Sequence, residues 1–248
     1  IPVGIHREYN TDGTIRGARI YNDNGVLISE GIVDAEGNRT GPWKDFSATG
    51  VLIAEGNYTA NRRTGGWKFY SNSGRLEQAG SYSSGRIDGT WRWYYPDGEL
   101  LREEDYYQGK RDGSYIEYTR TGEIIAQGTF ADGERNGLWK VTTGDNTEEG
   151  EYLLGLRNGE WKSYYPDGKL RFKGSYRQGN PEGHHVLYYE NGRTREDRYY
   201  RNGFRSRTWK KYDELGEVIL TITYRDDVEI SINGVPVNLP ESSVRQIR

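Results

Sequence analysis

Residues 88–100 read DGTWRWYYPDGEL, and residues 158–170 read NGEWKSYYPDGKL. In both segments a tryptophan opens a short run of aromatic residues, and a Pro-Asp-Gly sequence follows that run. Aromatic residues favour β-strands, and an Asp-Gly pair is typical of the tight turn between two antiparallel strands. Each segment therefore predicts one β-strand and the turn that leads into the next strand.

The same pattern repeats through most of the chain. From position 43 to position 209 an aromatic residue, or once a histidine, recurs at intervals of 24 residues, with a single interval of 22. We call these eight positions the anchors: Trp43, Trp67, Trp91, Tyr115, Trp139, Trp161, His185 and Trp209. Self-similarity at a fixed period of roughly 20–50 residues is the signature of a repeat architecture.

Other columns of the alignment share this period. A tyrosine or phenylalanine follows seven of the eight anchors by three residues, and an aromatic residue follows seven of them by fifteen, in four cases with Gly-x before it. Two kinds of turn signal separate these columns: an Asp-Gly or Asn-Gly pair, and a G-x-x-x-G segment such as Gly85 to Gly89. The segments between the turns have the length of strands. The chain is therefore predicted to be all-β, an elongated single-layer antiparallel meander of about eight 24-residue β-hairpin repeats.

The period divides the chain into three parts. Residues 1–40 fit it less well and are expected to form degenerate N-terminal cap repeats, since terminal repeats are usually atypical. Residues 41–225 form the predicted hairpin array, and residues 226–248 a C-terminal hairpin and tail. That hairpin is expected to turn at Asn233-Gly234, and the polar residues 239–248 to form the tail.

The composition excludes several classes of protein. Hydrophobic residues make up 33% of the 248 residues, which is low for a thick globular core, whereas aromatics reach 13%, which is high for a disordered chain. The net charge of −3 does not favour a nucleic-acid partner. Cysteine is absent, so the sequence offers no disulfide, thiol nucleophile or zinc–thiolate site.

No set of residues with catalytic or metal-binding spacing stands out. His185 takes an anchor position, which predicts a substituted anchor next to His184, and the third histidine, His6, is remote in sequence. The acidic runs at 103–105 and 226–227 place neighbouring carboxylates on opposite strand faces, unlike the paired carboxylates of glycosidases. We predict no catalytic residues, no metal site and no cofactor, and we do not expect an enzyme.

Strand alternation predicts a face that combines basic and aromatic side chains. The residues one and three after an anchor share one face, which we call the lysine face, because successive side chains of a strand point to opposite sides. Its tyrosines could simply pack across strands under the lysine stems, or the face could bind a partner. The candidate binding strip comprises Lys44, Lys68, Tyr70, Arg92, Tyr94, Tyr118, Lys140, Lys162, Tyr164, Tyr188, Lys210 and Tyr212.

The unit at residues 88–100 and 158–170, with Gly174-Ser175-Tyr176 after the second copy, resembles the bacterial variant of the MORN repeat, often labelled the YwqK-type antitoxin family. The resemblance covers roughly residues 41–224. It implies a β-hairpin repeat fold and a non-catalytic module that binds proteins or sits at membranes.

Three functions stay open at the level of sequence. The first is a scaffold for protein–protein interaction, with one or more protein partners, including the case of a subunit of a larger cell-envelope complex. The second is a glycan or cell-wall binding module that uses exposed aromatic rings. The third is peripheral attachment to a membrane surface through the Lys/Tyr face, where each basic residue would contribute about 1 kcal/mol on anionic lipid.

The location is an expectation only. The sequence begins with Ile1 and contains no methionine, which a removed secretory signal would explain. We therefore expect a bacterial envelope protein, in the periplasm or on the cell surface, with the cytoplasm as the alternative.

Overall fold

The computed structural model describes residues 1–237, which form 21 β-strands and no helix. The chain divides into two compact units. Unit 1 contains residues 1–124 and 130–133, and unit 2 contains residues 125–129 and the chain from residue 134 onward. Strand β11 (Ile124–Ala131) contributes to both units.

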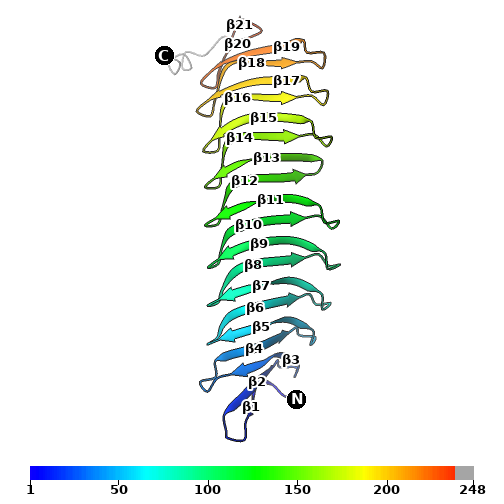
Figure 1. The fold of residues 1–248 in the computed structure, drawn as a ribbon, viewed down its shortest axis with the longest axis vertical. Coiled ribbons are helices and arrows are strands. Elements are labelled where there is room, and N and C mark those ends of the chain that lie inside the picture. The colour runs from blue at the N-terminus through cyan, green and yellow to red at the C-terminus, as the bar shows by residue number, and fades with distance from the viewer. Residues whose placement is uncertain (238–248) are drawn as a thin grey trace. The chain divides into compact units, whose positions relative to one another are not determined.

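Unit 1 is a single-layered sheet in which each strand pairs antiparallel with the next strand of the chain, from β1 to β10 (Figure 1). Its strands are β1 Gly4–Tyr9, β2 Ile15–Tyr21, β3 Leu27–Val33, β4 Arg39–Phe46, β5 Leu52–Thr59, β6 Arg62–Tyr70, β7 Leu76–Ser83, β8 Arg86–Tyr94, β9 Leu100–Tyr107 and β10 Lys110–Tyr118.

Unit 2 follows the same rule from β12 to β21. Its strands are β12 Glu134–Thr143, β13 Asn146–Leu153, β14 Leu156–Tyr164, β15 Leu170–Arg177, β16 Asn180–Tyr188, β17 Thr194–Arg201, β18 Phe204–Tyr212, β19 Val218–Arg225, β20 Val228–Ile232 and β21 Val235–Pro236. The predicted all-β antiparallel meander of hairpin repeats is confirmed.

Two kinds of turn alternate along the chain. The short turn between β7 and β8 has φ values of 51° at Ser84 and 84° at Gly85, as a two-residue type I′ hairpin requires. The prediction that the whole G-x-x-x-G segment forms this turn is wrong, because Gly89, with a φ of 72°, lies inside β8. The register of β7 and β8 shifts at that point, so the second glycine belongs to a β-bulge.

The longer turn carries the Pro-Asp-Gly signal. Between β8 and β9, Tyr95 N–H donates to the Glu99 carbonyl at 2.8 Å, and Gly98 N–H donates to the Tyr95 carbonyl at 2.9 Å. The Tyr95 hydroxyl then reaches the Tyr118 carbonyl in the following repeat, at 2.9 Å. Each such turn therefore fixes its own hairpin and also the next one.

The repeat of 22 residues loses its two residues in the longer turn. In both repeat lengths the anchor stands opposite a glycine, as Trp43 does to Gly56 and Trp139 to Gly150. The separation between these partners is 13 residues in the first case and 11 in the second. The strand register is therefore kept, and only the loop between β12 and β13 is shorter.

The core consists of the anchors and the aromatic residues between them. Trp67 is 1% exposed, and its ring stacks edge-on against Tyr58 and Tyr82, with centroids 5.1 and 6.1 Å away. Its indole N–H donates to the Asn57 carbonyl at 3.0 Å. From Trp43 to Trp91, tryptophan and tyrosine rings alternate in edge-to-face contact and stabilise one side of the unit 1 sheet.

The structure tests only part of the organisation predicted for the ends of the chain. The structure contains the C-terminal hairpin of β20 and β21, which turns at Asn233 and Gly234. The tail predicted for residues 239–248 lies outside the described residues. The boundaries placed at residues 40 and 225 stay predictions.

Candidate functional site

The lysine face exists as the strand alternation predicts. Lys68 of β6 lies opposite Glu55 of β5 in the register of the sheet, and the Tyr70 hydroxyl donates to the same carboxylate at 2.6 Å. The residues one and three after the anchor therefore share a face. The anchor Trp67 is buried whereas Lys68 is exposed, so the rings of the anchors occupy the opposite side.

A row of acidic residues lies between the basic ones, and sequence reasoning missed it. The antiparallel register places Lys44 opposite Glu30 and Glu55, and Lys210 opposite Asp197. We call these residues the acidic row: Glu30, Glu55, Glu103, Glu149 and Asp197. They come from the strands between the anchor-bearing strands. The lysine face is therefore a ladder in which positive and negative side chains alternate over much of its length.

The acidic row has its partners within the protein. Glu55 accepts from Tyr70, and Glu149 accepts from Tyr164, both at 2.6 Å. Burial, followed by the hydrogen bond to the carboxylate, raises the pKa of Tyr70 and of Tyr164 to about 12. Glu103 accepts from Arg92 Nε at 2.6 Å.

Several lysines of the same ladder have no ion partner. Within residues 1–237, no carboxylate lies within 4.0 Å of the ammonium groups of Lys44, Lys68, Lys140 and Lys210. All four are exposed. Lys162 differs, because its Nζ lies 2.9 Å from Glu160 Oε1. On this face, carboxylates are thus hydrogen-bonded within the protein, whereas these four ammonium groups have no ion partner among the described residues.

The tyrosines of the predicted strip differ in their surroundings. Tyr70 and Tyr164 hydrogen-bond to the acidic row, and the pKa values of Tyr118 and Tyr212 are raised, first by burial and then by Glu103 and Asp197. Tyr94 instead lines a groove, described below. For Tyr188, only the backbone carbonyl has a described partner, the Tyr165 hydroxyl at 2.7 Å. Whether the strip binds a partner stays a prediction.

A groove of about 780 Å³ lies over the lysine face of unit 1. Lys44, Lys68 and Arg92 line it together with Glu30 and Glu55. Small residues of the same strands also line it, Gly31, Gly56, Gly66, Ala79, Gly80 and Ser81, as do Trp43, Trp67 and Tyr94. The groove therefore has long charged side chains beside stretches of backbone where side chains are short or absent.

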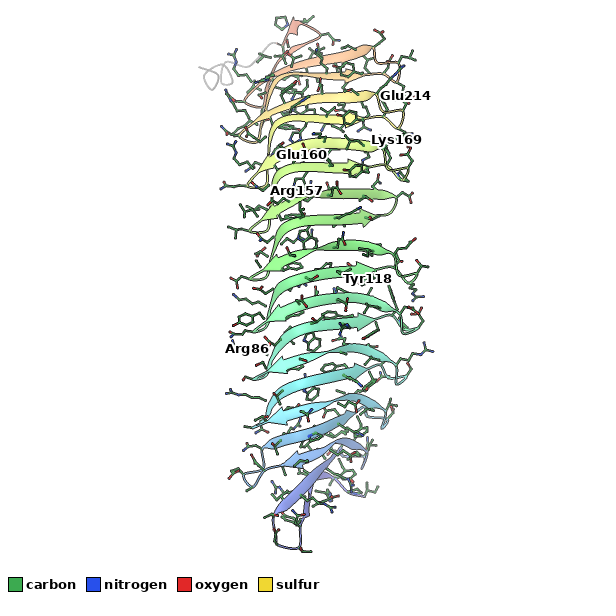
Figure 2. All side chains as sticks on the ribbon, viewed as in Figure 1. Arg86, Tyr118, Arg157, Glu160, Lys169 and Glu214 are labelled. Atoms are coloured by element: carbon green, nitrogen blue, oxygen red, sulfur yellow. The ribbon has the colours of Figure 1, made fainter. Side chains whose placement is uncertain are left out.

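On the opposite face, a column of arginines four residues before the anchors stacks on their rings. The guanidinium carbon lies 4.4 Å from the ring centroid for Arg63 on Trp67 and 4.2 Å for Arg157 on Trp161. Arg63 Nη1 also donates to the Tyr82 hydroxyl at 3.3 Å. Figure 2 shows Arg157 and Glu160 on the first half of β14, and Lys169 in the longer turn that follows this strand. These arginines bury and order the aromatic band.

The histidines have structural surroundings. His185 is 3% exposed, and its Nε2 lies 2.7 Å from the Ser175 carbonyl, the position that an indole N–H takes in other repeats. Burial lowers the pKa of His185. His184 contacts Asp197 and stacks on Tyr199 with ring centroids 4.5 Å apart. Within residues 1–237, no group of three His, Cys, Asp or Glu side chains gathers as a metal site would require.

The anchor Tyr115 departs from the pattern in a way the sequence did not reveal. Opposite it, where most repeats have glycine, stands Glu104, which is 1% exposed. His185 and Trp209 likewise lie opposite Arg198 and Ile222. The carboxylate of Glu104 accepts from the Tyr106 hydroxyl at 2.6 Å and lies 3.3 Å from Arg111 Nε. This buried cluster fills the space that a large indole ring would otherwise occupy.

The repeats match a known family. Residues 39–60, 87–108 and 157–178 each match the MORN repeat variant, and each match covers one hairpin: β4–β5, β8–β9 and β14–β15. The match does not separate the YwqK-type subfamily, which stays a prediction. No curated protein matches the chain. In residues 1–237 we find no helical segment with the length and hydropathy to cross a bilayer.

MORN repeats are a non-catalytic repeat type that generally mediates protein or membrane interactions. Strand order, anchor spacing and three matched hairpins are consistent with the MORN repeat variant family.

Proposed function

We propose that the chain is a non-catalytic scaffold that binds one or more proteins through its lysine face, as a subunit of a larger assembly in the cell envelope. The observation that carries the proposal is the imbalance on that face. Carboxylates of the acidic row accept hydrogen bonds within the protein, whereas Lys44, Lys68, Lys140 and Lys210 are exposed and have no ion partner within residues 1–237. Free cations on every second strand, as Lys44 and Lys68 are in unit 1, favour an anionic partner and give it a fixed register.

The structure supports this function over glycan binding. Aromatic platforms for sugars need an exposed ring face, but Trp43, Trp67, Trp91, Trp139 and Trp161 are all 1–3% exposed. Their rings lie flat against glycine backbone and donate their N–H groups to carbonyls of the sheet. These tryptophan rings are therefore part of the core and have no free face on which a sugar could stack.

Attachment to anionic lipid is also less well supported. A lipid-binding face gains from uncompensated positive charge near the surface. On the lysine face Glu55 lies directly across from both Lys44 and Lys68, about one strand spacing of ~4.8 Å away. A partner with discrete negative charges at a fixed spacing complements this alternation of charges better than a uniformly negative lipid surface does.

The test is affinity purification from the native source with mass spectrometry of bound proteins. The variant Lys68→Ser/Lys210→Ser removes one free lysine from each unit. The control Lys110→Ser/Lys211→Ser removes two lysines that lie elsewhere, Lys110 paired with Asp132 and Lys211 on the anchor side of β18. We expect stoichiometric partners that are lost in the first variant and kept in the second. Partners retained equally by both variants would contradict a role for the lysine face.

The cell-envelope location is part of the proposal and has its own test. Fractionation of the native source should recover the protein with the periplasm or the membranes. Recovery in the cytoplasm would overturn the location but would leave the binding face untouched.

A further inference from the structure

The groove on unit 1 has a feature that other parts of the lysine face lack. Next to the row of Lys44, Lys68 and Arg92 run small side chains, Gly66 and Ser81 among them. The column that contains Gly66 also holds Pro42 and Thr90 in the groove, whereas in unit 2 it holds Leu138, Glu160, His184 and Thr208. An open channel therefore runs across the strands in unit 1, beside its basic row.

The basic residues of this channel recur on every second strand. Lys44 is on β4, Lys68 on β6 and Arg92 on β8. With strands spaced by ~4.8 Å, the charges recur about every 9.6 Å along the channel. Two of the three, Lys44 and Lys68, are the unpaired lysines of unit 1, and Arg92 is paired with Glu103.

The spacing selects among the conformations that a bound peptide could take. Same-side residues of an extended strand recur every ~6.7 Å. On an α-helix a side chain returns to the same face after seven residues, ~10.5 Å, with a drift of ~20° each time. A polyproline II helix has three residues per turn with a rise of ~3.1 Å, so every third side chain lies on one line at ~9.3 Å. Only this last period agrees closely with the basic row.

We propose that the groove of unit 1 binds an acidic protein segment in the polyproline II conformation, with a carboxylate at every third residue. Two successive carboxylates pair with Lys44 and Lys68, and a third reaches Arg92. From Lys44 to Arg92 the channel crosses four strand spacings, ~19 Å, which is the length of about six residues in this conformation. The inference rests on the proposed function and names the chemistry of the partner.

The acidic residues of the groove do not oppose this occupant. Glu55 is engaged by the Tyr70 hydroxyl at 2.6 Å, and Glu30 by Arg19 Nε at 3.4 Å. Arg19 also lies 2.8 Å from Glu8. Arg19 offsets the charge of Glu30, whereas the Tyr70 hydroxyl is neutral and leaves Glu55 charged. The lining of the groove as a whole has five basic and three acidic side chains, so its net charge is positive.

The experiment compares two labelled peptides of equal charge and composition by fluorescence anisotropy with the full chain. The first repeats Glu-Pro-Pro four times. The second has three glutamates at one end, then eight prolines and the fourth glutamate, so that no two carboxylates lie three or six residues apart. We expect the spaced peptide to bind at least about tenfold more tightly, because two aligned exposed ion pairs together contribute roughly that factor.

The binding site is tested with two double variants of equal charge change. Lys44→Ser/Lys68→Ser should weaken binding of the spaced peptide about tenfold, and Lys140→Ser/Lys210→Ser in unit 2 should change it less than about twofold. Circular dichroism and melting temperature establish that both variants are folded. All four substituted lysines are exposed, so we expect both double variants to fold.

Three outcomes would overturn the inference. Equal binding of both peptides would mean that charge alone is recognised, and equal loss in both variants would place the peptide elsewhere. Binding of neither peptide, together with native partners that depend on Lys68 and Lys210, would refute the polyproline II occupant and leave the scaffold intact. If native partners ignore these lysines, the proposed function itself fails.

Discussion

At the scale of single residues, the fold depends on how closely a tryptophan ring approaches a glycine. A Cβ atom built on Gly56 would lie 2.3 Å from the Trp67 ring, and one on Gly80 would lie 2.3 Å from the Trp91 ring. No other residue leaves room for the ring to lie flat on the backbone. The glycine column that precedes the aromatic column in the sequence is therefore a packing requirement and not a turn.

We predict that Gly56→Ala destabilises the protein by about 1–3 kcal/mol, because the ring of Trp67 must move or the strands must separate. Gly66→Ala is the matched control, since a Cβ at Gly66 meets no atom within 4 Å. Urea denaturation measures both. A control that costs as much as Gly56→Ala would show that glycine is required for its backbone freedom instead.

A second prediction concerns the buried tyrosine hydroxyls. The pKa of Tyr70 and of Tyr164 is raised from 10.0 to about 12, by burial first and then by the hydrogen bond to Glu55 or Glu149. The folded state keeps these protons longer than the unfolded state, so their contribution is complete below pH 10 and is lost as the pH rises towards 12. The urea midpoint should therefore fall between pH 9 and pH 11.5.

The variant Tyr70→Phe/Tyr164→Phe should show a smaller fall in midpoint over this range, although it starts from a lower stability at pH 9. Tyr9→Phe, at a position that is 58% exposed, should follow the unmodified protein. Identical pH dependence in all three proteins would show that the two hydroxyls do not control it.

At the scale of elements, the pair of strands β9 and β10 replaces the glycine–tryptophan contact by an ionic one. Glu104 and Tyr115 occupy the two positions, and Arg111 and Tyr106 complete the cluster around the carboxylate. A buried carboxylate is tolerated because each neighbour supplies positive charge or a hydrogen bond. Removing the carboxylate leaves Arg111 without the negative charge that lies 3.3 Å from its Nε and removes the acceptor of the Tyr106 hydroxyl.

Glu104→Ala should therefore destabilise the protein by about 3–5 kcal/mol. Glu104→Gly/Tyr115→Trp restores the pair found in other repeats and should recover at least half of that loss. Thermal unfolding of the two variants and the unmodified chain gives the comparison. A double variant no better than Glu104→Ala would mean that the surrounding arginines prevent the indole ring from packing.

Sequence reasoning identified the strands in which the same type of residue recurs at the same position of each repeat. The anchors and the tyrosines that follow them are of one chemical type, so the hairpins and the lysine face could be predicted. The acidic row could not, because its column also contains Ala79, Lys173 and Thr221. Only the antiparallel register brings Glu55 beside Lys68. The role of Glu104 was hidden because a glutamate in a polar run resembles a solvated residue.

At the scale of the whole molecule, stability should be a sum of local terms. Each strand pairs with its sequence neighbours, and each ring contacts rings of adjacent strands, as Trp67 contacts Tyr58 and Tyr82. Contacts between strands far apart in the sequence are scarce in such an arrangement. A repeat protein of this kind can open in one place while the rest stays paired.

Hydrogen exchange tests this locality within unit 1. In Gly56→Ala, amide exchange should accelerate in β5 and β6 and in their neighbours β4 and β7. Exchange in β9 and β10 should keep its rate to within about twofold, because several strand interfaces separate them from the substitution. Uniform acceleration through unit 1 would instead show that the unit unfolds as one cooperative block.

The repeat of 22 residues shows which changes of length the chain tolerates. Its two missing residues came out of a loop, and the pairing of Trp139 with Gly150 was kept. In evolutionary terms, duplication or loss of one whole 24-residue hairpin leaves every remaining hairpin beside a neighbour with which it can pair. A gene of this design can lengthen or shorten by unequal recombination in steps of 24 codons, whereas an insertion within a strand would shift an indole ring off its glycine.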